Sequence, residues 1–380
     1  MNAGLSSREV VLLGVGHTNA HLLRMWRRQP IPDARLTCIS NFPVATYSGM
    51  LPGVLAGQYP VEQMQIDLVR LCDAAGARLI VGNVTRLDVT QRLVHLDDHP
   101  SVPFDVLSIG IGSVPSMKNV EIVGNSLMPI KPMQTFLDRL TGRLECWQEH
   151  RSRDELRVVV VGGGAGGVEL AFCLPAAIQR IANVLTIQLT LVHNGRSLVP
   201  GTLERTSHLV SSELKRRGVE VHLQRMVVHV ADDHVSLDDG RTIPADVVIW
   251  ATGAAPPPLL SQLELPTARD GFLLTRSTLQ TTGDAPIFVV GDTGTREDDP
   301  TPKAGVYAVR QGPVLWENIH RQLRGKSLQK FRPQRGFLKL LNTGDGRAIG
   351  EYKGLSFHTS WAWKLKDWID RRFMDKFAVR

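Results

Sequence analysis

One pattern occurs twice in this sequence and limits what the chain can fold into. An apolar strand candidate runs into a glycine-rich turn, and an apolar-periodic stretch follows, at residues 10–23 and again at residues 157–174. A second strand candidate comes after each copy, at residues 34–40 and 187–193. Strand, helix and strand in this order form a βαβ unit with parallel strands. The sequence therefore predicts an α/β protein with two Rossmann-like, parallel-sheet dinucleotide-binding domains of the glutathione reductase type.

Three further segments are apolar and end in small residues, as strands buried on both faces require: 104–113, 245–254 and 286–292. Residues 219–231 and 232–244 are interpreted as hairpins, the second with a two-residue turn at Asp239–Gly240.

We expect the first domain to be discontinuous, with residues 1–118 and 259–330, and the second domain to be inserted as residues 119–258. Residues 331–380 would form a C-terminal α+β segment that carries a basic amphipathic helix.

In the second copy, Gly162, Gly164 and Gly167 complete the spacing G-x-G-x-x-G between strand and helix. The first glycine permits the tight turn, the second lets a pyrophosphate approach the backbone, and the third lets helix and strand pack closely. The pyrophosphate then meets the free N–H groups at the positive end of the helix. A glycine-rich turn with a purely structural role is the alternative, and the four preceding valines favour the dinucleotide site.

The first copy is degenerate, because Gly14 and Gly16 are present but Asn19 stands at the third glycine position. A bound dinucleotide is predicted here as well. His17 and His21 flank the turn at i, i+4 spacing, which would suit two metal ligands on one helix face. No third ligand is evident, so we expect no metal and interpret both as helix-surface or phosphate-proximal imidazoles.

The carboxylate that binds an adenosine ribose is expected at the end of the second strand of each unit. The first unit has Ser40 and Asn41 there, which can still hydrogen-bond a ribose hydroxyl. The second unit has His193, followed by Arg196. Because the acid is missing and an arginine lies close by, no side chain here would repel a 2′-phosphate. The sequence is therefore compatible with either NADH or NADPH. Asp292, at the tip of a late strand, could accept a hydrogen bond from a sugar-like hydroxyl or could cap the next turn.

Composition fits an enzyme body, since 43% of the 380 residues are hydrophobic and 21% are charged. These fractions exclude disordered, collagen-like and coiled-coil chains. No apolar run approaches the roughly 18 residues of a membrane-spanning helix, and the start lacks a secretion signal, so we expect a cytoplasmic protein. The four cysteines are widely spaced, which indicates reduced thiols and argues against a redox-active disulfide.

Nearly all of the net charge of +7 lies in the last fifty residues, because residues 331–380 contain 11 Lys or Arg and 5 Asp or Glu. Within them, residues 361–377 predict an amphipathic helix. Its expected apolar face consists of Ala362, Leu365, Trp368, Ile369, Phe373 and Phe377. That face could pack on the first domain, form a homodimer or make peripheral contact with the cytoplasmic face of a membrane. Interleaved acids and the lack of a recognition motif weigh against nucleic acid.

Six motifs together carry a family resemblance: GVGHTNAH, YSGMLPGVLAG (47–57), GGGAGGVELA, ATGA, VVGD and PKAGVYAVRQGP. In combination they resemble the flavoprotein reductases of the pyridine nucleotide-disulfide oxidoreductase family. Within it the chain is similar to the NADH dehydrogenase-like branch, which includes type II NADH:quinone oxidoreductases. The YSGMLPG segment and the C-terminal sequence also resemble a flavoprotein subgroup found fused to selenide, water dikinase.

The resemblance implies FAD on the first glycine turn and NADH or NADPH on the second. Segments 47–53 and 303–311 would flank the isoalloxazine ring, and Asp292 would bind the ribitol. The residues implied for FAD are Gly14, Gly16, His17, Asn19, Ser40, Asn41, Gly49, Asp292, Lys303 and Ala304. Those implied for the nicotinamide dinucleotide are Gly162, Gly164, Gly167, His193, Arg196 and Gly253. Glu169 would orient the nicotinamide amide, or would be a carboxylate favoured in the first turn of a helix.

The resemblance therefore predicts a FAD-dependent NAD(P)H dehydrogenase that passes electrons to an acceptor, most plausibly a quinone. Gln311 is the one part of the quinone-site motif that can be placed, so the flavin is the firmer inference. Two alternatives stay open. One is a reductase of a soluble carrier or of a selenium or sulfur species, and the other is a nucleotide-sensing flavoprotein with little turnover.

Overall fold

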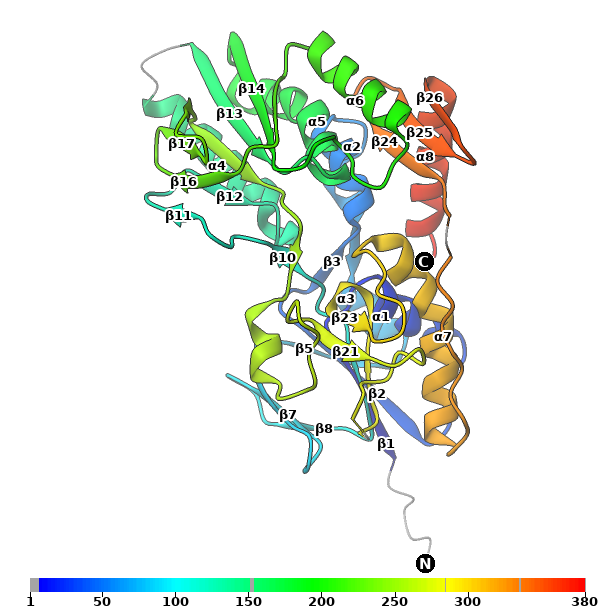
Figure 1. The fold of residues 1–380 in the computed structure, drawn as a ribbon. Helices are drawn as coiled ribbons and strands as arrows, with labels where there is room; N and C mark the ends of the chain where they lie inside the picture. Colours follow the sequence, from blue (N-terminus) through cyan, green and yellow to red (C-terminus); the bar gives the residue numbers. More distant parts are fainter. Residues whose placement is uncertain (1–6, 151–153, 284, 335, 380) are drawn as a thin grey trace, which may run out of the picture.

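The structure, a computed structural model, describes residues 7–150, 154–283, 285–334 and 336–379. Two parallel five-stranded sheets form the centres of two lobes, called here the lower lobe and the upper lobe after their positions in Figure 1. The first six residues, part of the start in which no secretion signal was expected, lie outside the described residues. The predicted α/β class with two Rossmann-like parallel sheets is confirmed, and the domain boundaries stay a proposal.

The lower lobe is built on a sheet that combines early and late parts of the chain. Its strands, all parallel, follow the order β22 (Ile287–Val289), β9 (Val106–Ile109), β1 (Arg8–Leu13), β2 (Ala34–Ser40) and β5 (Arg78–Val81). Side chains alternate across β1: Val10 and Leu12 pack with the helical side of the lobe, and Val11 and Leu13 pack on the opposite side. The helices are α1 (His17–Arg28), α3 (Leu68–Ala74) and α7 (Gly305–Leu323), and the opposite side is covered by β6 (Val84–Asp88), β7 (Leu93–Leu96) and β8 (Val102–Pro103).

The upper lobe repeats this plan with a second parallel sheet. Its strand order is β12 (Leu127–Pro129), β19 (Val247–Trp250), β13 (Glu155–Val161), β14 (Thr186–His193) and β15 (Glu220–Leu223). Its helices are α4 (Phe136–His150), α5 (Ala165–Ala182) and α6 (Glu204–Arg216), and an outer sheet contains β11 (Glu121–Ile122), β16 (Val227–Val230), β17 (His234–Leu237) and β18 (Thr242–Pro244). The four valines of β13 are buried on both faces, as predicted for a central parallel strand.

One of the two expected hairpins is absent. Residues 232–244 do form a hairpin, β17 and β18, around the Asp239–Gly240 turn. Residues 219–231 do not, because β15 joins the parallel sheet beside β14, whereas β16 pairs with β17 in the outer sheet. The interpretation of 219–231 as a hairpin was wrong, since short apolar runs do not reveal which sheet they join.

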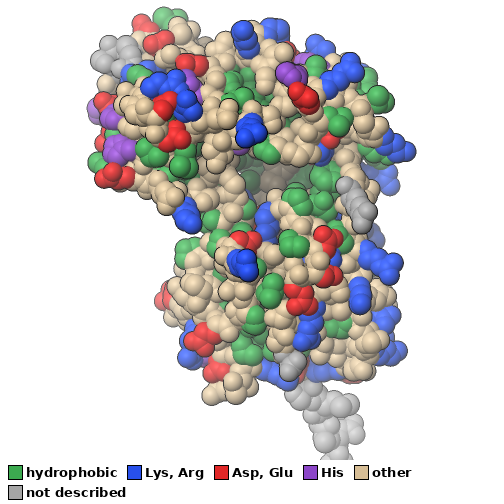
Figure 2. Space-filling view, viewed as in Figure 1, with side chains coloured by type: hydrophobic (Ala, Val, Ile, Leu, Met, Phe, Trp, Pro, Cys, Tyr) green, Lys and Arg blue, Asp and Glu red, His purple; other side chains and the backbone are tan. Residues whose placement is uncertain are grey.

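Twelve shorter elements complete the fold of the described residues. They are β3 (Val44–Thr46), η1 (Ser48–Met50), α2 (Leu51–Leu55), η2 (Val61–Met64), β4 (Gln65–Asp67), β10 (Val114–Pro115), η3 (Met133–Thr135), β20 (Ala254–Ala255), η4 (Pro258–Gln262), β21 (Leu273–Thr275), η5 (Gly291–Thr293) and β23 (Gly294–Arg296), where η marks a 3₁₀ helix. The surface is indented between the two lobes, and apolar side chains gather at the indentation (Figure 2).

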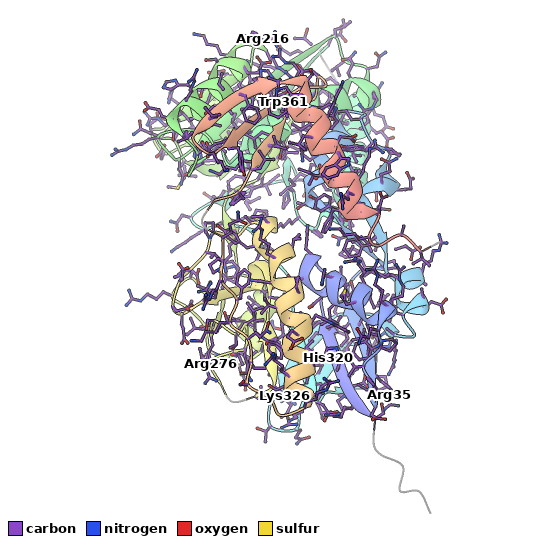
Figure 3. The ribbon with its side chains drawn as sticks, turned by 90° about the vertical axis from the view of Figure 1, so that its right-hand side faces the viewer. Arg35, Arg216, Arg276, His320, Lys326 and Trp361 are labelled. Atoms are coloured by element: carbon purple, nitrogen blue, oxygen red, sulfur yellow. The ribbon has the colours of Figure 1, made fainter. Side chains whose placement is uncertain are left out.

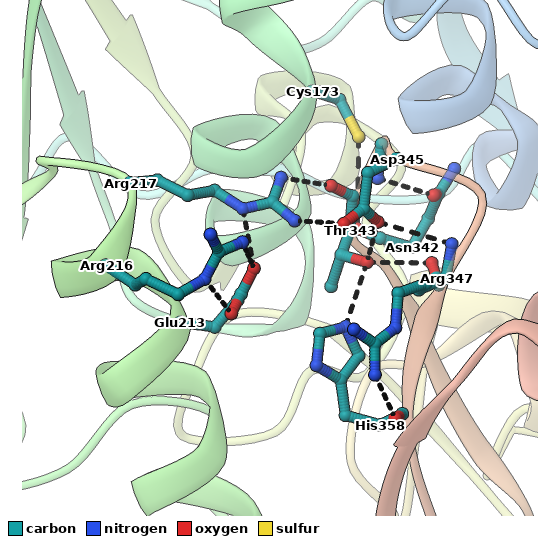
Figure 4. Close-up of polar contacts among 10 residues, drawn as sticks. Cys173, Glu213, Arg216, Arg217, Asn342, Thr343, Asp345, Arg347 and His358 are labelled. Carbon is teal, nitrogen blue, oxygen red and sulfur yellow. Dashed lines mark hydrogen bonds and ion pairs between the residues drawn. The ribbon is translucent and has the colours of Figure 1, made fainter.

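The C-terminal segment packs against the upper lobe as an antiparallel sheet followed by a helix: β24 (Lys339–Asn342), β25 (Ala348–Tyr352), β26 (Leu355–Thr359) and α8 (Ser360–Met374). A polar cluster attaches this sheet to α6 (Figure 4). Arg217 donates to Glu213 at 2.8 Å, to Asp345 at 2.7 Å and to the carbonyl oxygen of Thr343. Ligand atoms of Glu213, Asp345 and His358 lie within 4.8 Å of one another, and the arginine pairs with both carboxylates account for this grouping.

Helix α8 runs from Trp361 along the side of the molecule toward the lower lobe (Figure 3). Its orientation differs from the expected one. Lys366 and Asp370 are buried, whereas Trp368 and Ile369, which belong to the predicted apolar face, are 54% and 37% exposed. The predicted face is therefore divided between the interior and the surface. Among the helices of the described part of the chain, none is long and apolar enough to cross a bilayer.

Candidate functional site

The second glycine turn connects β13 to α5 and depends on two close backbone approaches. Gly162 has a φ of +119°, and a Cβ there would lie 2.2 Å from the carbonyl oxygen of Ala251. A Cβ on Gly167 would lie 1.8 Å from the carbonyl oxygen of Gly162. A Cβ on Gly164, by contrast, would meet no atom within 4 Å. The outer glycines are therefore required for packing, and the space beside Gly164 at the helix N-terminus is open.

The loop after β14 lies over this turn. A Cβ on Gly163 would come within 2.6 Å of the His193 ring, and a Cβ on Gly195 would come within 2.5 Å of His193 Nε2. The imidazole is thus held between two glycines. Arg196 is exposed on the same loop. On the other strand, β19, the backbone after the strand approaches Gly162 at Ala251 and Thr252. Gly253 follows them and accepts a backbone hydrogen bond from Ser116 at 2.8 Å.

The first glycine turn connects β1 to α1 and explains why asparagine replaces the third glycine. Gly14 has a φ of +77°, and a Cβ there would lie 2.8 Å from the carbonyl oxygen of Gly110. Asn19 is fully buried and donates to the carbonyl oxygens of Gly14 at 2.7 Å and Ser108 at 3.3 Å. Its Oδ1 accepts from the Ser108 hydroxyl at 2.7 Å. Asn19 therefore connects the turn to β9 by hydrogen bonds. A third glycine at this position would allow close packing of helix and strand but would supply no side-chain hydrogen bond.

Asp292 lies at the same end of the lower sheet, in η5. It accepts from the Ser113 hydroxyl at 2.9 Å and forms an ion pair of 3.7 Å with Lys131, which belongs to the upper lobe. Lys131 also donates to Ser113 at 2.8 Å. Burial lowers the pKa of Lys131, and Asp292 opposes that effect. Gln311 on α7 accepts from the backbone N–H of Gly291 at 2.6 Å, so its side chain supports the turn that carries Asp292.

The remaining predicted residues of the lower lobe lie around this edge. Ser40 is the last residue of β2, and Asn41, which follows it, donates to Asn83 at 2.9 Å. Lys303 donates to the carbonyl oxygen of Gly294 at 2.6 Å and lies over the ring of Phe272. Burial lowers the pKa of Lys303 to about 8. Ala304 is the residue before α7.

Three rings lie together beside the first turn. The Phe373 ring of α8 lies 5.8 Å from the His17 ring and 4.6 Å from the Tyr47 ring, between centroids. His17 Nε2 is buried and has no hydrogen-bond partner among the described residues. Burial lowers the pKa of His17 to about 4, so the imidazole is neutral at pH 7. The C-terminal helix thus reaches the first glycine turn.

Three charged residues form what is called here the α8 charge group: Glu169, Lys366 and Asp370. Lys366 Nζ donates to Asp370 and to the carbonyl oxygen of Gly49, each at 2.9 Å. The hydroxyl of Tyr47 donates to Asp370 at 2.9 Å. The sequence analysis missed Lys366 and Asp370, although the i, i+4 Lys–Asp pair inside an otherwise apolar stripe was a usable signal.

Glu169 joins the group from α5. It is the fifth residue of that helix and so lies beyond the first turn, and its Oε1 accepts from the backbone N–H of Asn342 at 2.8 Å. Burial raises the pKa of Glu169 to about 7, although Lys366 and the Asn342 N–H favour its charged form. Burial alone would lower the pKa of Lys366, but Glu169 and Asp370 reverse this and hold it above its usual value.

Comparison with known families identifies the fold. The family model described as pyridine nucleotide-disulphide oxidoreductase matches residues 8–312, which is most of the chain. The chain belongs to this family. It is therefore an oxidoreductase whose cofactors are FAD and NAD(P)H, and the predicted family with its NADH dehydrogenase-like branch is confirmed.

Three curated relatives place this member of the family more closely. A type II NADH:quinone oxidoreductase of Haemophilus influenzae is 28% identical over 61% of this chain and 59% of its own length. The demethylphylloquinone reductase NdbB of Synechocystis is 25% identical over 72% of this chain and 70% of its own length. The NADH dehydrogenase-like protein YutJ of Bacillus subtilis is 23% identical over 86% and 87%. The chain thus spans less than two thirds of the first of these relatives.

Solved structures agree on the fold. NDH2 from Plasmodium falciparum in complex with NADH superimposes with a TM-score of 0.79 at 14% identity, over 98% of this chain and 97% of that one. The sulfide:quinone oxidoreductase of Aquifex aeolicus gives a TM-score of 0.77 at 16% identity, over 97% and 91%.

The residues present fit both cofactors of the family. At the first turn, the close approach at Gly14 and the unpartnered His17 Nε2 suit a bound pyrophosphate. At the second, the open space beside Gly164 at the N-terminus of α5 does the same. The four cysteines are free thiols. Cys38 and Cys72, which are far apart in the sequence, are buried in the core of the lower lobe and share a side-chain hydrogen bond. Cys173 is buried in α5, and Cys146 is exposed on α4.

Proposed function

We propose that this protein transfers electrons from NAD(P)H through FAD to a quinone. FAD, when bound, accepts hydride from NAD(P)H and passes electrons onward, and the chain's task is to hold the two cofactors in contact and to manage protons. For FAD we propose Gly14, Gly16, His17, Asn19, Ser40, Asn41, Gly49, Asp292, Lys303 and Ala304. For the nicotinamide dinucleotide we propose Gly162, Gly164, Gly167, His193, Arg196 and Gly253. Residues 1–118 and 259–330 would form the FAD domain, and residues 119–258 the NAD(P)H domain.

The α8 charge group carries the proposal. Reduction of a quinone to a quinol takes up two protons with two electrons, so a proton donor beside the acceptor is needed. A carboxyl group with a pKa of about 7, such as Glu169, is protonated in part of the molecules at neutral pH and can donate. Lys366 stabilises the carboxylate that remains, and it also binds Gly49 in the YSGM segment. In this proposal Glu169 acts as proton donor to the acceptor and does not orient the nicotinamide.

A cavity of about 420 Å³ lies on the outer side of Met50. Its apolar lining includes Ile66, Met374 at the end of α8 and Phe377 beyond that helix, and its polar lining includes Arg371 and Glu62. Six of its lining residues are apolar and seven are polar or charged, so it offers both an apolar surface to a flat ring and hydrogen-bonding groups to the oxygens that the ring carries. It supports an acceptor that enters between α8 and the lower lobe.

Glu169→Gln separates the two half-reactions. We expect anaerobic reduction of the flavin by NADH to stay within about threefold of wild type, and quinone turnover to fall about 100-fold, the usual contribution of a general acid. In the wild type, turnover should also decline as the pH rises through about 7, because Glu169 loses its proton there. The variant should lack that inflection. Stopped-flow absorbance and steady-state assays at several pH values measure both effects.

The matched control is Glu204→Gln, which neutralises an exposed carboxylate on α6. It should leave both half-reactions unchanged. A second readout is stability. The pKa of Glu169 is raised from 4.5 to about 7 by folding, so the protonated side chain adds to the free energy of unfolding. This stabilisation is complete below pH 4.5 and is lost as the pH rises through about 7. Unchanged quinone turnover in Glu169→Gln would refute the proton-donor role.

We also propose that the exposed aromatic face of the C-terminal segment makes the peripheral membrane contact. Trp361 and Trp368 are 52% and 54% exposed, and Leu355 is 68% exposed. Arg372 lies over the Trp368 ring at 5.0 Å. Tryptophan with nearby cations is typical of surfaces that bind at a bilayer interface. A homodimer through the same face is the alternative occupant.

The double variant Trp361→Ser, Trp368→Ser tests this contact. We expect it to keep the turnover of a water-soluble quinone and to lose most of the turnover of a long-chain quinone embedded in anionic vesicles, together with co-sedimentation with those vesicles. If the variant still binds vesicles, and if sedimentation velocity shows that the wild type is a dimer and the variant a monomer, the face is a dimer interface. This variant is preferable to truncation before residue 361, because Lys366 and Phe377 are buried.

A further inference from the structure

The strand order of each sheet indicates the direction in which a dinucleotide would lie across it. A dinucleotide binds where the strand order reverses, and its adenosine ribose lies at the end of the second strand of the βαβ unit. In the lower sheet that strand is β2, so the flavin half of FAD would extend the other way, over the ends of β9 and β22. In the upper sheet it is β14, so the nicotinamide half would extend over the ends of β19 and β12.

Lys131 and Asp292 join these two strand ends across the lobes. Lys131 follows β12 in the upper lobe, and Asp292 follows β22 in the lower lobe. Lys131 Nζ lies 3.7 Å from Asp292 Oδ2, and it donates at 2.8 Å to the hydroxyl of Ser113, which follows β9. The ends of the two expected cofactor paths are thus in contact, and the basic group at this contact comes from the upper lobe.

The ammonium group of Lys131 is accessible to a ligand. Its side chain is 30% exposed. The Ser113 hydroxyl donates to Asp292 at 2.9 Å, so this carboxylate has a partner besides the lysine. An ammonium group has three donors, and Ser113 and Asp292 use at most two of them. At least one donor of Lys131 can therefore turn toward a bound group.

The ionisable groups near Lys131 differ from it in charge or in the partners that hold them. Burial lowers the pKa of His17 to about 4, and Asp292 and Lys131 are close enough to influence it, so the imidazole beside them is neutral at pH 7. Lys303 also lies near Asp292, but its Nζ donates to the carbonyl oxygen of Gly294 within the lower lobe. Burial lowers the pKa of Lys131, and Asp292 favours its charged form. Lys131 is therefore a cation that faces the lower lobe from the upper one.

We propose that Lys131 stabilises the negative charge that the flavin ring acquires on reduction, and so raises its reduction potential. Hydride transfer from NAD(P)H adds two electrons and one proton to the neutral ring, so the reduced ring is an anion and the oxidised nicotinamide is a cation. A preorganised cation beside the ring stabilises that anion relative to the oxidised form, most strongly where water is excluded. The inference rests on the proposed function, because it assigns an electrostatic role where the two cofactors of that function meet.

Midpoint potentials of the FAD-bound protein test this role. They are measured by anaerobic titration with dithionite against a reference dye. We expect Lys131→Met to weaken the binding of reduced FAD relative to oxidised FAD at least about tenfold, which lowers the two-electron potential by about 30 mV or more. Lys131→Arg keeps the positive charge, and its ratio of affinities should stay within about twofold of wild type, or about 10 mV.

Two further variants control for the exchange itself. Lys215→Met makes the same replacement at an exposed lysine on α6 and should leave the potential unchanged. Lys131→Gln is neutral but keeps a donor for Ser113, so it gives the same comparison if Lys131→Met does not retain FAD. Wild-type potentials in Lys131→Met and Lys131→Gln would refute the proposal. An equal decrease in Lys131→Arg and Lys131→Met would also refute it, because the charge would then not be the cause.

The proposed function and the role of Lys131 can fail separately. Dithionite reduces the flavin without NAD(P)H, so the potentials are measured whichever nucleotide the protein uses. If NADH or NADPH reduces the wild-type flavin and the neutral variants keep the wild-type potential, only the role of Lys131 fails. If neither nucleotide reduces the wild-type flavin, the proposed function fails whatever the potentials are.

Discussion

Gly164→Asp is expected to abolish reduction of the flavin by NAD(P)H while FAD stays bound. The space beside Gly164 is open, so the fold can accept a side chain there. A carboxylate at the N-terminus of α5 would occupy the position of the pyrophosphate and repel it, where the free N–H groups otherwise bind it. We expect the rate of anaerobic flavin reduction at fixed NAD(P)H to fall by at least about 100-fold, measured by stopped-flow absorbance.

Gly164→Ala is the matched control, because its methyl group meets no atom within 4 Å. It should retain most of the reduction rate and the full FAD content. Gly167→Ala is a contrasting variant, since its Cβ would lie 1.8 Å from the Gly162 carbonyl oxygen, and it should destabilise the upper lobe. A Gly164→Asp protein that is reduced at the wild-type rate would show that the dinucleotide binds elsewhere.

Lys366→Met is expected to lower the free energy of unfolding of the FAD-bound protein by about 3 kcal/mol or more, the usual effect of removing one partner of a buried ion pair. Asp370 is buried and would lose its ion-pair partner, and the carbonyl oxygen of Gly49 would lose its donor. The pKa of Glu169 should rise further, because the positive charge that favours its ionised form is removed. Denaturant titration followed by flavin and tryptophan fluorescence measures the loss.

The double variant Lys366→Met, Asp370→Asn shows whether the loss comes from the unpaired charge. It should recover part of the stability, because no uncompensated carboxylate then remains at position 370. Lys364→Met, on the exposed face of the same helix, should change stability by less than about 0.5 kcal/mol. Equal stabilities for Lys366→Met and Lys364→Met would mean that the buried pair adds nothing to the docking of α8.

Asn19 and strand β15 are two features whose structure depends on residues far away in the sequence. Asn19 could be recognised as a departure from the glycine pattern, but its role required the position of Ser108 on β9, which is 89 residues away. The same holds for β15, whose choice between a hairpin and the parallel sheet depended on the neighbouring strand β14. Contacts between segments that are distant in the sequence decided both outcomes. A residue pattern within one segment carries no information about such contacts.

The two βαβ units and their glycine turns followed from the sequence by itself, because the tight backbone approach that a dinucleotide requires imposes residue types at fixed local spacing. Only the tertiary structure decided how α8 sits. Helical periodicity separates two faces but does not say which one another element will cover. Lys366 and Asp370 point inward because Gly49, Tyr47 and Glu169 provide the hydrogen bonds and charges that buried ions need. Those partners come from two other parts of the chain, the segment around η1 and helix α5.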